Sequence, residues 1–182
     1  RKSEFDGNIN NNSSYGVDAN LKFFKNLVLS SYYAASDDTI SRKDNSVSRL
    51  SIGWRGDLWD ISGFYKKVGE NFNPEMGFVK RLGYRKVLFR ILNRTRPKDF
   101  FGILELRPHI TYWGYWKLED GFQETGFLHI DNHWEFRNGF RIDTGINFTR
   151  EGVVDSFQIV SGEWVPPSTY DNKEIHVRTN TN

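Results

Sequence analysis

The sequence contains no cysteine, which excludes a disulfide scaffold and thiol chemistry. It also lacks any run of about 18 consecutive apolar residues, so no transmembrane helix is expected. The net charge of +2 is too small to indicate a nucleic-acid-binding protein. None of the common hydrolase, phosphate-binding or dinucleotide-binding motifs is present, so we identify no enzyme class, expect no cofactor and name no catalytic residue.

Aromatic residues, by contrast, are abundant. They make up 16% of the 182 residues, although the mean hydropathy is low at -0.63. A soluble core usually carries more Leu, Ile and Ala beside its aromatic residues. An outer-membrane β-barrel reconciles the two values, because one face of each strand meets lipid, the other face is polar, and aromatic residues gather at both membrane interfaces.

Apolar and polar residues alternate with a period of two along most of the chain, which predicts antiparallel strands. The alternating segments are residues 15–23, 27–35, 48–54, 59–65, 87–91, 100–116, 122–136, 140–150, 153–165 and 175–177. We expect roughly 8–10 strands in neighbour-to-neighbour order, as in outer-membrane barrels.

The clearest unit is a predicted hairpin over residues 122–150. Asn138-Gly139 lies between its two arms and predicts a two-residue type I′ turn. Both arms exceed the ~5–6 residues usual in globular sheets. In the strand before this hairpin, Pro108 predicts a bulge or a strand end, because proline donates no ladder hydrogen bond.

The remaining segments are predicted to be connections. We expect residues 1–14 to form a polar loop or linker, 36–45 an exposed loop and 68–83 an irregular segment. Pro166-Pro167 is expected to end the strand that precedes it. The β-barrel region is predicted over 15–179 and a truncated tail over 180–182. Since the chain begins with Arg1 and has no signal peptide or terminal aromatic strand, we expect the natural protein to start upstream and the barrel to continue downstream.

The predicted fold is therefore all-β, an antiparallel up-and-down β-barrel of the outer-membrane type or an incomplete fragment of one. The same alternation also predicts a soluble barrel if the apolar face points inward. Long arms, aromatic residues near strand ends and polar faces of mixed charge favour lipid. The membrane interpretation fails if Ile130 and Ile146 are enclosed while His129 and Asp143 face bulk water.

One segment carries a family resemblance. The run from Asn71 to Arg81 contains the residues Asn71, Phe72, Asn73, Pro74, Gly77, Phe78 and Arg81. It resembles the FNPxxGFxxR signature of the DUF5916 family, found mostly in Bacteroidetes and related Gram-negative bacteria, and the likeness extends over roughly Tyr15 to Val165. Physically, Asn73-Pro74 and Gly77 favour a structured turn; a loop folded into the lumen as a constriction is the alternative.

The resemblance implies a location in the bacterial outer membrane, with membrane lipid as a partner. In that family a domain like a family 9 carbohydrate-binding module usually precedes the barrel, which implies a role in glycan binding or uptake through an upstream domain. That module is absent from this sequence and the family has no established catalytic residues, so no ligand residue is transferred.

His129, Asp131 and His133 share one strand face at a spacing of two, and imidazole and carboxylate are ligands for zinc. A metal site would still need a ligand from another strand. We therefore favour a hydrated polar wall with an ion-pair ladder to Arg137 and Arg141, and predict no metal.

The segment after the signature is basic, and Lys86, Arg90, Arg94 and Arg96 are candidates for a positive stripe facing the lumen or for contact with the phosphates of lipid heads. We favour the interpretation in which the arginines pair with Glu105, Asp131 or Glu135 across a plugged lumen.

Three functions remain open. The first is an outer-membrane channel or anchoring barrel; the second is a soluble β-barrel or sandwich that binds a carbohydrate or an apolar ligand; the third is a non-catalytic part of a carbohydrate-active hydrolase. Trp113 and Trp116 are candidates for stacking sugars, but we favour anchoring at the membrane interface, which explains them without a ligand. Glu105, Glu124 and Glu135 are the carboxylates available for glycoside cleavage, but spacing in the sequence does not set their separation.

Overall fold

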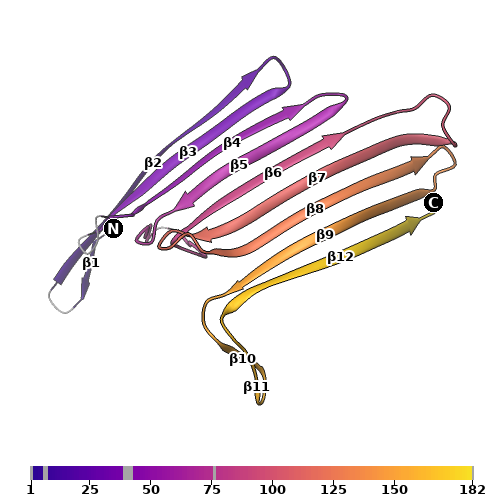
Figure 1. Cartoon of the computed structure of the whole chain (residues 1–182). Helices are drawn as coiled ribbons and strands as arrows, with labels where there is room; N and C mark the ends of the chain where they lie inside the picture. The colour runs from indigo at the N-terminus through magenta and orange to yellow at the C-terminus, as the bar shows by residue number, and fades with distance from the viewer. Residues whose placement is uncertain (1, 6–7, 39–42, 76, 182) are drawn as a thin grey trace.

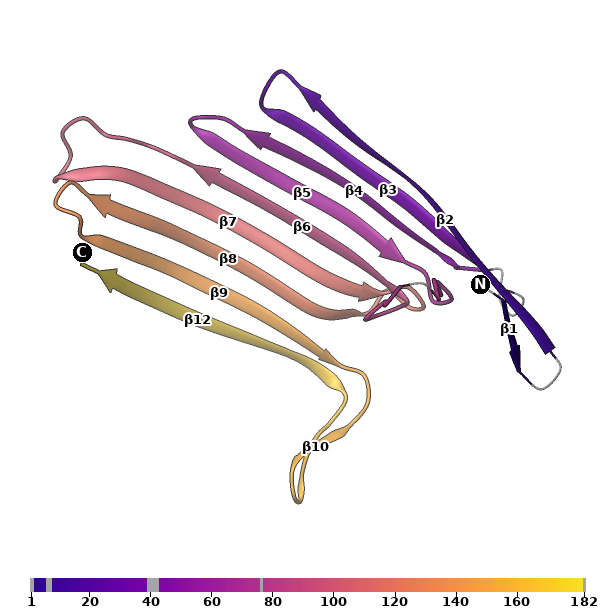
Figure 2. The same cartoon turned by 180° about the vertical axis from the view of Figure 1, so that it is seen from behind.

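The computed structural model describes residues 2–5, 8–38, 43–75 and 77–181, and these residues form a single curved layer of strands (Figures 1 and 2). Ten strands make one antiparallel sheet in the order β1-β2-β3-β4-β5-β6-β7-β8-β9-β12, and β10 and β11 form a separate hairpin. The strands are β1 (Lys2–Phe5), β2 (Asn8–Phe23), β3 (Leu27–Asp38), β4 (Ser46–Arg55), β5 (Trp59–Val68), β6 (Tyr84–Asn93), β7 (Ile103–Lys117), β8 (Gln123–Phe136), β9 (Arg141–Val153), β10 (Phe157–Val160), β11 (Glu163–Val165) and β12 (Ser168–Asn180). The predicted all-β, antiparallel, neighbour-to-neighbour arrangement is confirmed.

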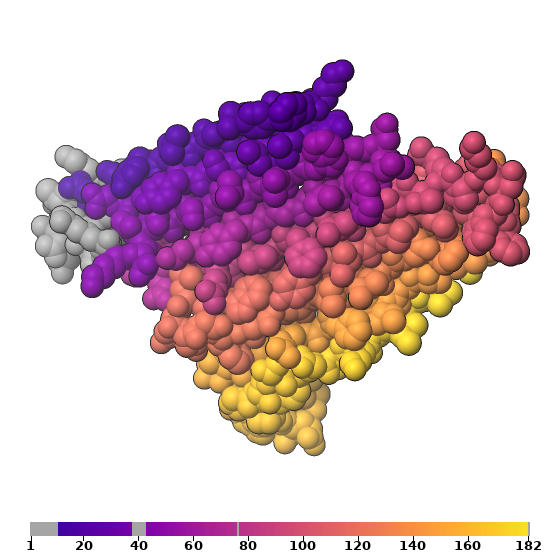
Figure 3. All heavy atoms as spheres, turned by 45° about the horizontal axis from the view of Figure 1, so that its top comes forward, coloured from indigo at the N-terminus to yellow at the C-terminus, as the bar shows by residue number. Residues whose placement is uncertain are grey.

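The sheet is open. Within the described residues β1 and β12 each have one neighbour, and they do not pair with each other. The accessible surface is 12878 Å², whereas a compact monomer of 21.3 kDa exposes about 9,100 Å². The space-filling view shows the same strands side by side as one continuous slab (Figure 3).

The sheet has two chemically distinct faces. Residues directly opposite each other in an antiparallel pair point to the same side, so the register assigns each residue to a face. Ile52, Phe89 and Ile130 lie on the side that we call the apolar face. Arg90 and His129 lie on the other side, which we call the polar face. The alternation in the sequence predicted this division.

The connection between β8 and β9 differs from the predicted type I′ turn. Gly139 has a positive φ of 85°, but Asn138 does not, and a type I′ turn needs both. The amide of Gly139 donates to the carbonyl of Phe136, and the amide of Phe136 donates to the carbonyl of Phe140. This pattern matches the three-residue hairpin loop in which only the last position is left-handed.

The predicted bulge or strand end at Pro108 is also wrong, because β7 runs through this residue and stays in register with β8. Regular pairing of β7 with β6 ends at His109, and Leu106 next bonds to Thr95. Alternate residues of a strand turn their backbone groups toward the same neighbour. Pro108 therefore faces β6 at a position where β6 no longer pairs with β7, so its lack of an N–H group breaks no regular hydrogen bond.

The polar N-terminal stretch is strand rather than the predicted loop. Asn12, Ser13 and Ser14 pair with the end of β3, and β1 pairs with the first residues of β2. Backbone pairing supplied by β3 outweighs the weak β-propensity of Asn and Ser.

The predicted single strand over residues 153–165 is wrong as well. β9 ends at Val153, and the chain then forms the β10–β11 hairpin around Gly162, which has a positive φ of 90°. This hairpin projects beyond the end of the large sheet (Figure 1). After Pro166-Pro167 the chain returns as β12, which pairs with β9 along its whole length and is far longer than the weak strand predicted near Ile175.

Parts of four predictions lie outside the described residues. These are positions 1 and 6–7 of the N-terminal loop, 39–42 of the loop after β3, Met76 of the signature and Asn182 of the tail. The predicted irregular segment is confirmed over the described residues of 69–83, whereas Val68 ends β5. The predicted exposed loop over 36–45 is wrong at its start, because Ser36 to Asp38 extend β3 and Ser36 is buried.

Candidate functional site

The polar face carries the signature segment and two cavities, of about 630 and 580 Å³. Basic side chains dominate this face over β2 to β6, where they are Lys22, Arg49, Arg55, Lys66, Lys86 and Arg90. Acidic side chains dominate it over β7 to β12, where they are Glu105, Asp131, Glu135, Asp143, Glu151 and Glu174. The β7 to β12 part also carries Arg107, Lys117, Arg141 and Arg178, so this part of the face is of mixed charge while the β2 to β6 part is mainly basic.

The signature segment between β5 and β6 folds back over the polar face. Phe72 is only 7% exposed and packs with Val47, Val68 and Tyr84, which form the buried apolar cluster of this face. Burial of one large aromatic side chain holds the segment against three strands, β4, β5 and β6. Phe78 of the same segment is 86% exposed and makes no comparable contribution.

Hydrogen bonds extend this anchoring to β2 and β3. The amide of Asn73 donates to Ser36 Oγ at 2.9 Å, and Asn12 Nδ2 donates to the carbonyl of Asn73 at 2.8 Å. The amide of Gly77 donates to the carbonyl of Pro74 at 2.7 Å and closes a tight turn. The hydrogen bond between Gly77 and Pro74 supports the predicted structured turn, and the segment lies over the polar face of the open sheet. Constriction of a lumen stays a prediction.

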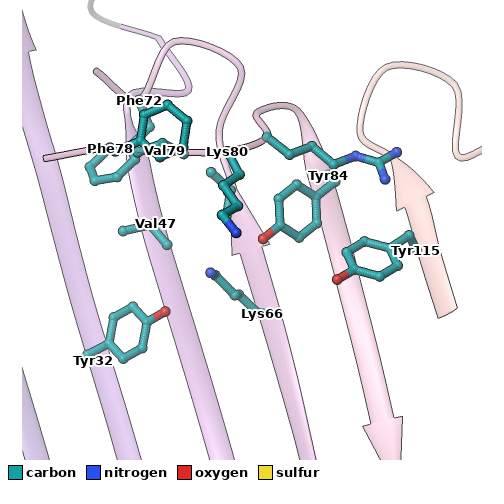
Figure 4. Close-up of a pocket in the computed structure, with 11 residues that line it drawn as sticks. Tyr32, Val47, Lys66, Phe72, Phe78, Val79, Lys80, Tyr84 and Tyr115 are labelled. Carbon is teal, nitrogen blue, oxygen red and sulfur yellow. The ribbon is translucent and has the colours of Figure 1, made fainter. Parts of the chain in front are cut away.

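The segment covers a cavity of about 630 Å³. Figure 4 shows Lys66 from β5 and Lys80 from the segment pointing into it, beside Tyr32, Tyr84 and Tyr115. Arg81, the last signature residue, pairs with Glu124 and lies over the ring of Tyr115 at 5.2 Å. Two lysine ammonium groups and three phenol rings make this cavity suitable for anionic or hydroxyl-rich groups.

The predicted basic stripe is only half present. Lys86 and Arg90 lie on the polar face of β6, and Lys86 Nζ donates to Tyr115 Oη at 2.8 Å. Arg94 and Arg96 lie beyond the end of β6 and pair with Asp60 at 3.7 Å and Glu105 at 2.6 Å. Strand alternation ends at Asn93, so the spacing of two no longer fixes a face for the last two residues.

Trp113 and Trp116 do not form a common platform. Trp113 opposes Phe127 on the polar face, whereas Trp116 opposes Arg85 on the apolar face. Residues three apart on a strand point to opposite sides. The proposed sugar-stacking pair is therefore wrong.

The three candidate carboxylates are all engaged in ion pairs. Glu105 and Glu135 face each other across β7 and β8 and share Arg107, at 3.5 and 3.2 Å. Glu124 pairs with Arg81 at the other end of the sheet. The arrangement is a salt-bridge network on the polar face.

All four histidines of the chain gather around Asp131. His129 and His133 come from β8, as the sequence predicted, while His109 from β7 and His176 from β12 arrive from neighbouring strands. Asp131 Oδ2 lies 3.5 Å from His129 Nε2, 3.7 Å from His133 Nε2 and 3.0 Å from His176 Nε2.

Of the two arginines predicted to form an ion-pair ladder with the His129 to His133 face, only Arg141 lies near a carboxylate of this cluster. Arg141 Nε lies 3.5 Å from Asp143, which also lies 3.8 Å from His133. Arg137 instead donates to the carbonyl of Lys98. Sequence reasoning missed His109, His176 and the small residue Gly145, whose hydrogen leaves room for the ring of His176. The sequence offered two signals for these histidines. Each lies at a polar position in the alternation of its strand, and the chain contains only four histidines.

No protein-family model, curated protein or solved structure matches this chain. The resemblance to the DUF5916 family therefore stays a prediction carried by the signature residues. Among the described residues, no helix is long and apolar enough to cross a bilayer.

Proposed function

We propose that this chain is part of the wall of an outer-membrane β-barrel, with its apolar face toward lipid and its polar face toward a lumen. The supporting observation is an unbroken row of large apolar side chains across the nine long strands of the sheet. From β2 to β12 the row is Phe23, Leu27, Trp54, Ile61, Ile91, Ile110, Ile130, Ile146 and Ile175.

Seven of the nine residues of this row are exposed, and Leu27 and Ile110 are partly buried. Ile61 is 42% and Ile146 40% exposed, and the row has no second layer over it among the described residues. A soluble barrel or sandwich would have to enclose these side chains, because isoleucine is among the residues most often buried in water-soluble proteins. Lipid-facing strands carry such a continuous apolar band as a rule.

Charged groups show the opposite behaviour. Glu105, Asp131 and Asp143 are buried on the polar face, where they contact arginine or histidine. Buried carboxylates are tolerated when they are paired. A lumen lined by paired charges and His accounts for this arrangement, and the signature segment folded over the same face narrows that lumen.

The connections at the two ends of the sheet differ in length. The two longest connections, the segment 69–83 and the β10–β11 excursion, lie at one end, together with the β7–β8 connection of five residues. At the opposite end the β2–β3, β4–β5 and β8–β9 connections have three or four residues and the β6–β7 connection has nine. Outer-membrane barrels have short periplasmic turns and long extracellular loops. We therefore assign the end of the sheet that carries the signature segment to the extracellular side of the outer membrane. Glycan binding is assigned to an upstream domain, as the family resemblance implies.

Cell fractionation of the natural full-length protein tests the proposal. We expect it in the outer-membrane fraction, resistant to extraction by urea and released by detergent. Recovery as a monomer in detergent-free buffer would support the soluble alternative and overturn the membrane assignment.

A further inference from the structure

The geometry around Asp131 points to a binding site for a divalent transition-metal ion, with His109, His129, His133 and Asp131 as ligands. This inference concerns the polar face alone and does not depend on what covers the apolar face.

The two nearest nitrogens carry the argument. His109 Nε2 and His129 Nε2 lie 3.1 Å apart. His109 Nδ1 lies 3.1 Å from the carbonyl of Arg107, and His129 Nδ1 lies 2.7 Å from Asn147 Oδ1. Both of those oxygens accept only, so both Nδ1 atoms carry a hydrogen, and when both rings are neutral each Nε2 has a lone pair at this contact.

Asn147 supports this assignment of hydrogens. Its Nδ2 donates to Glu174 Oε2 at 3.3 Å, which fixes Oδ1 as the atom that faces His129. Two lone pairs at this separation repel unless a proton or a metal ion lies between them. Nitrogens bound at about 2.0–2.1 Å to one tetrahedral zinc ion are about 3.3 Å apart, close to the observed spacing.

Asp131 supplies the anionic ligand. Its residue is 6% exposed, and Oδ1 has no hydrogen-bond partner among the described residues. One ligand atom each from His109, Asp131 and His133 lies within 4.8 Å of the other two, and His129 Nε2 lies 3.5 Å from Asp131 Oδ2. A buried carboxylate with one oxygen beside imidazole nitrogens and the other without a donor fits a metal site.

The surrounding residues position these ligands. His176 Nε2 lies 3.0 Å from Asp131 Oδ2 and holds the carboxylate from the side of β12. Arg107 and Asn147 accept from the ring nitrogens that face away from the site, as outer-shell partners of histidine ligands commonly do. The ligand types are imidazole and carboxylate without thiolate, which suits Zn²⁺ and related ions.

Titration of the natural protein with Zn²⁺, after purification without a polyhistidine tag, tests the site. We expect one Zn²⁺ per chain, with a rise in the melting temperature on binding. Co²⁺ in the same protein should give the intense visible absorption of tetrahedral coordination. Failure of the unaltered protein to bind Zn²⁺, or a weak octahedral Co²⁺ spectrum, would overturn the proposal without any variant.

Variants locate the ion. Asn147→Ala removes an outer-shell partner and is expected to weaken Zn²⁺ binding by about 10–100-fold. His109→Gln and His133→Gln remove ligands and should weaken it more. Glu135→Gln is the matched control for His133→Gln, since Glu135 lies on the same face of β8 but pairs with Arg107. This variant should leave the Zn²⁺ affinity unchanged. Equal binding by His109→Gln, His133→Gln and the control would assign the ion to another place and contradict the inference.

Discussion

Ile130 and Asp131 are adjacent in β8, yet the isoleucine is 45% exposed and the aspartate 6%. Their side chains point to opposite faces of one sheet, so the difference describes the two environments rather than two regions of the protein. A water-soluble protein places such residues the other way round. The proposed place of this chain in the wall of an outer-membrane barrel follows from that inversion.

Charge introduced on the two faces should have unequal effects. Ile61→Arg places a guanidinium in the apolar row, whereas Ser62→Arg places it on the polar face beside a cavity of about 580 Å³. In lipid vesicles we expect Ile61→Arg to reduce the free energy of unfolding by about 2–4 kcal/mol if this position lies near the bilayer midplane. Urea unfolding measures this change, and an equal effect of Ser62→Arg would contradict the assignment of faces.

The signature segment should depend on Phe72 rather than on Phe78. Phe72→Ala removes the buried ring from its cluster and is expected to cost about 3–5 kcal/mol, because Phe-to-Ala changes in packed sites leave a cavity. Limited proteolysis should then cleave within residues 69–83. Phe78→Ala is the control, and faster cleavage of that variant would show that the exposed ring also anchors the segment.

Gly145 should tolerate no side chain. A Cβ at this position would lie 2.4 Å from His176 Cε1, so Gly145→Ala must displace the imidazole that holds Asp131. We expect a loss of about 1–3 kcal/mol, as for other overpacked sites. Gly53→Ala has no atom within 4 Å of the added Cβ and should leave stability unchanged. Equal melting temperatures of the two variants would remove the role assigned to Gly145.

Much of the sheet could be predicted from the sequence, because a period of two fixes which residues share a face. The segments 15–23, 27–35 and 122–150 show the predicted faces and the predicted neighbours. Pro108 and residues 8–14 could not be predicted in the same way. Their conformation depends on where a neighbouring strand begins or ends, which local alternation does not encode.

Prediction of the histidine cluster around Asp131 from the sequence has the same limit. His129 and His133 were visible as candidates because they lie in one strand. His109 and His176 reach Asp131 only through the register of β7 with β8 and of β9 with β12. A shift of one residue in either pairing would turn these rings to the apolar face. The convergence of four histidines is therefore a property of long-range pairing.

Site-directed fluorescence in lipid vesicles tests the central claim most directly, and the absence of cysteine allows single introduced cysteines to be labelled uniquely. The informative pairs are Ser51→Cys with Ile52→Cys in β4, and Phe89→Cys with Arg90→Cys in β6. Labels at Ile52 and Phe89 should be quenched by a lipid-bound quencher, and labels at Ser51 and Arg90 by aqueous iodide. Quenching of both members of each pair by iodide alone would contradict a lipid-facing apolar surface.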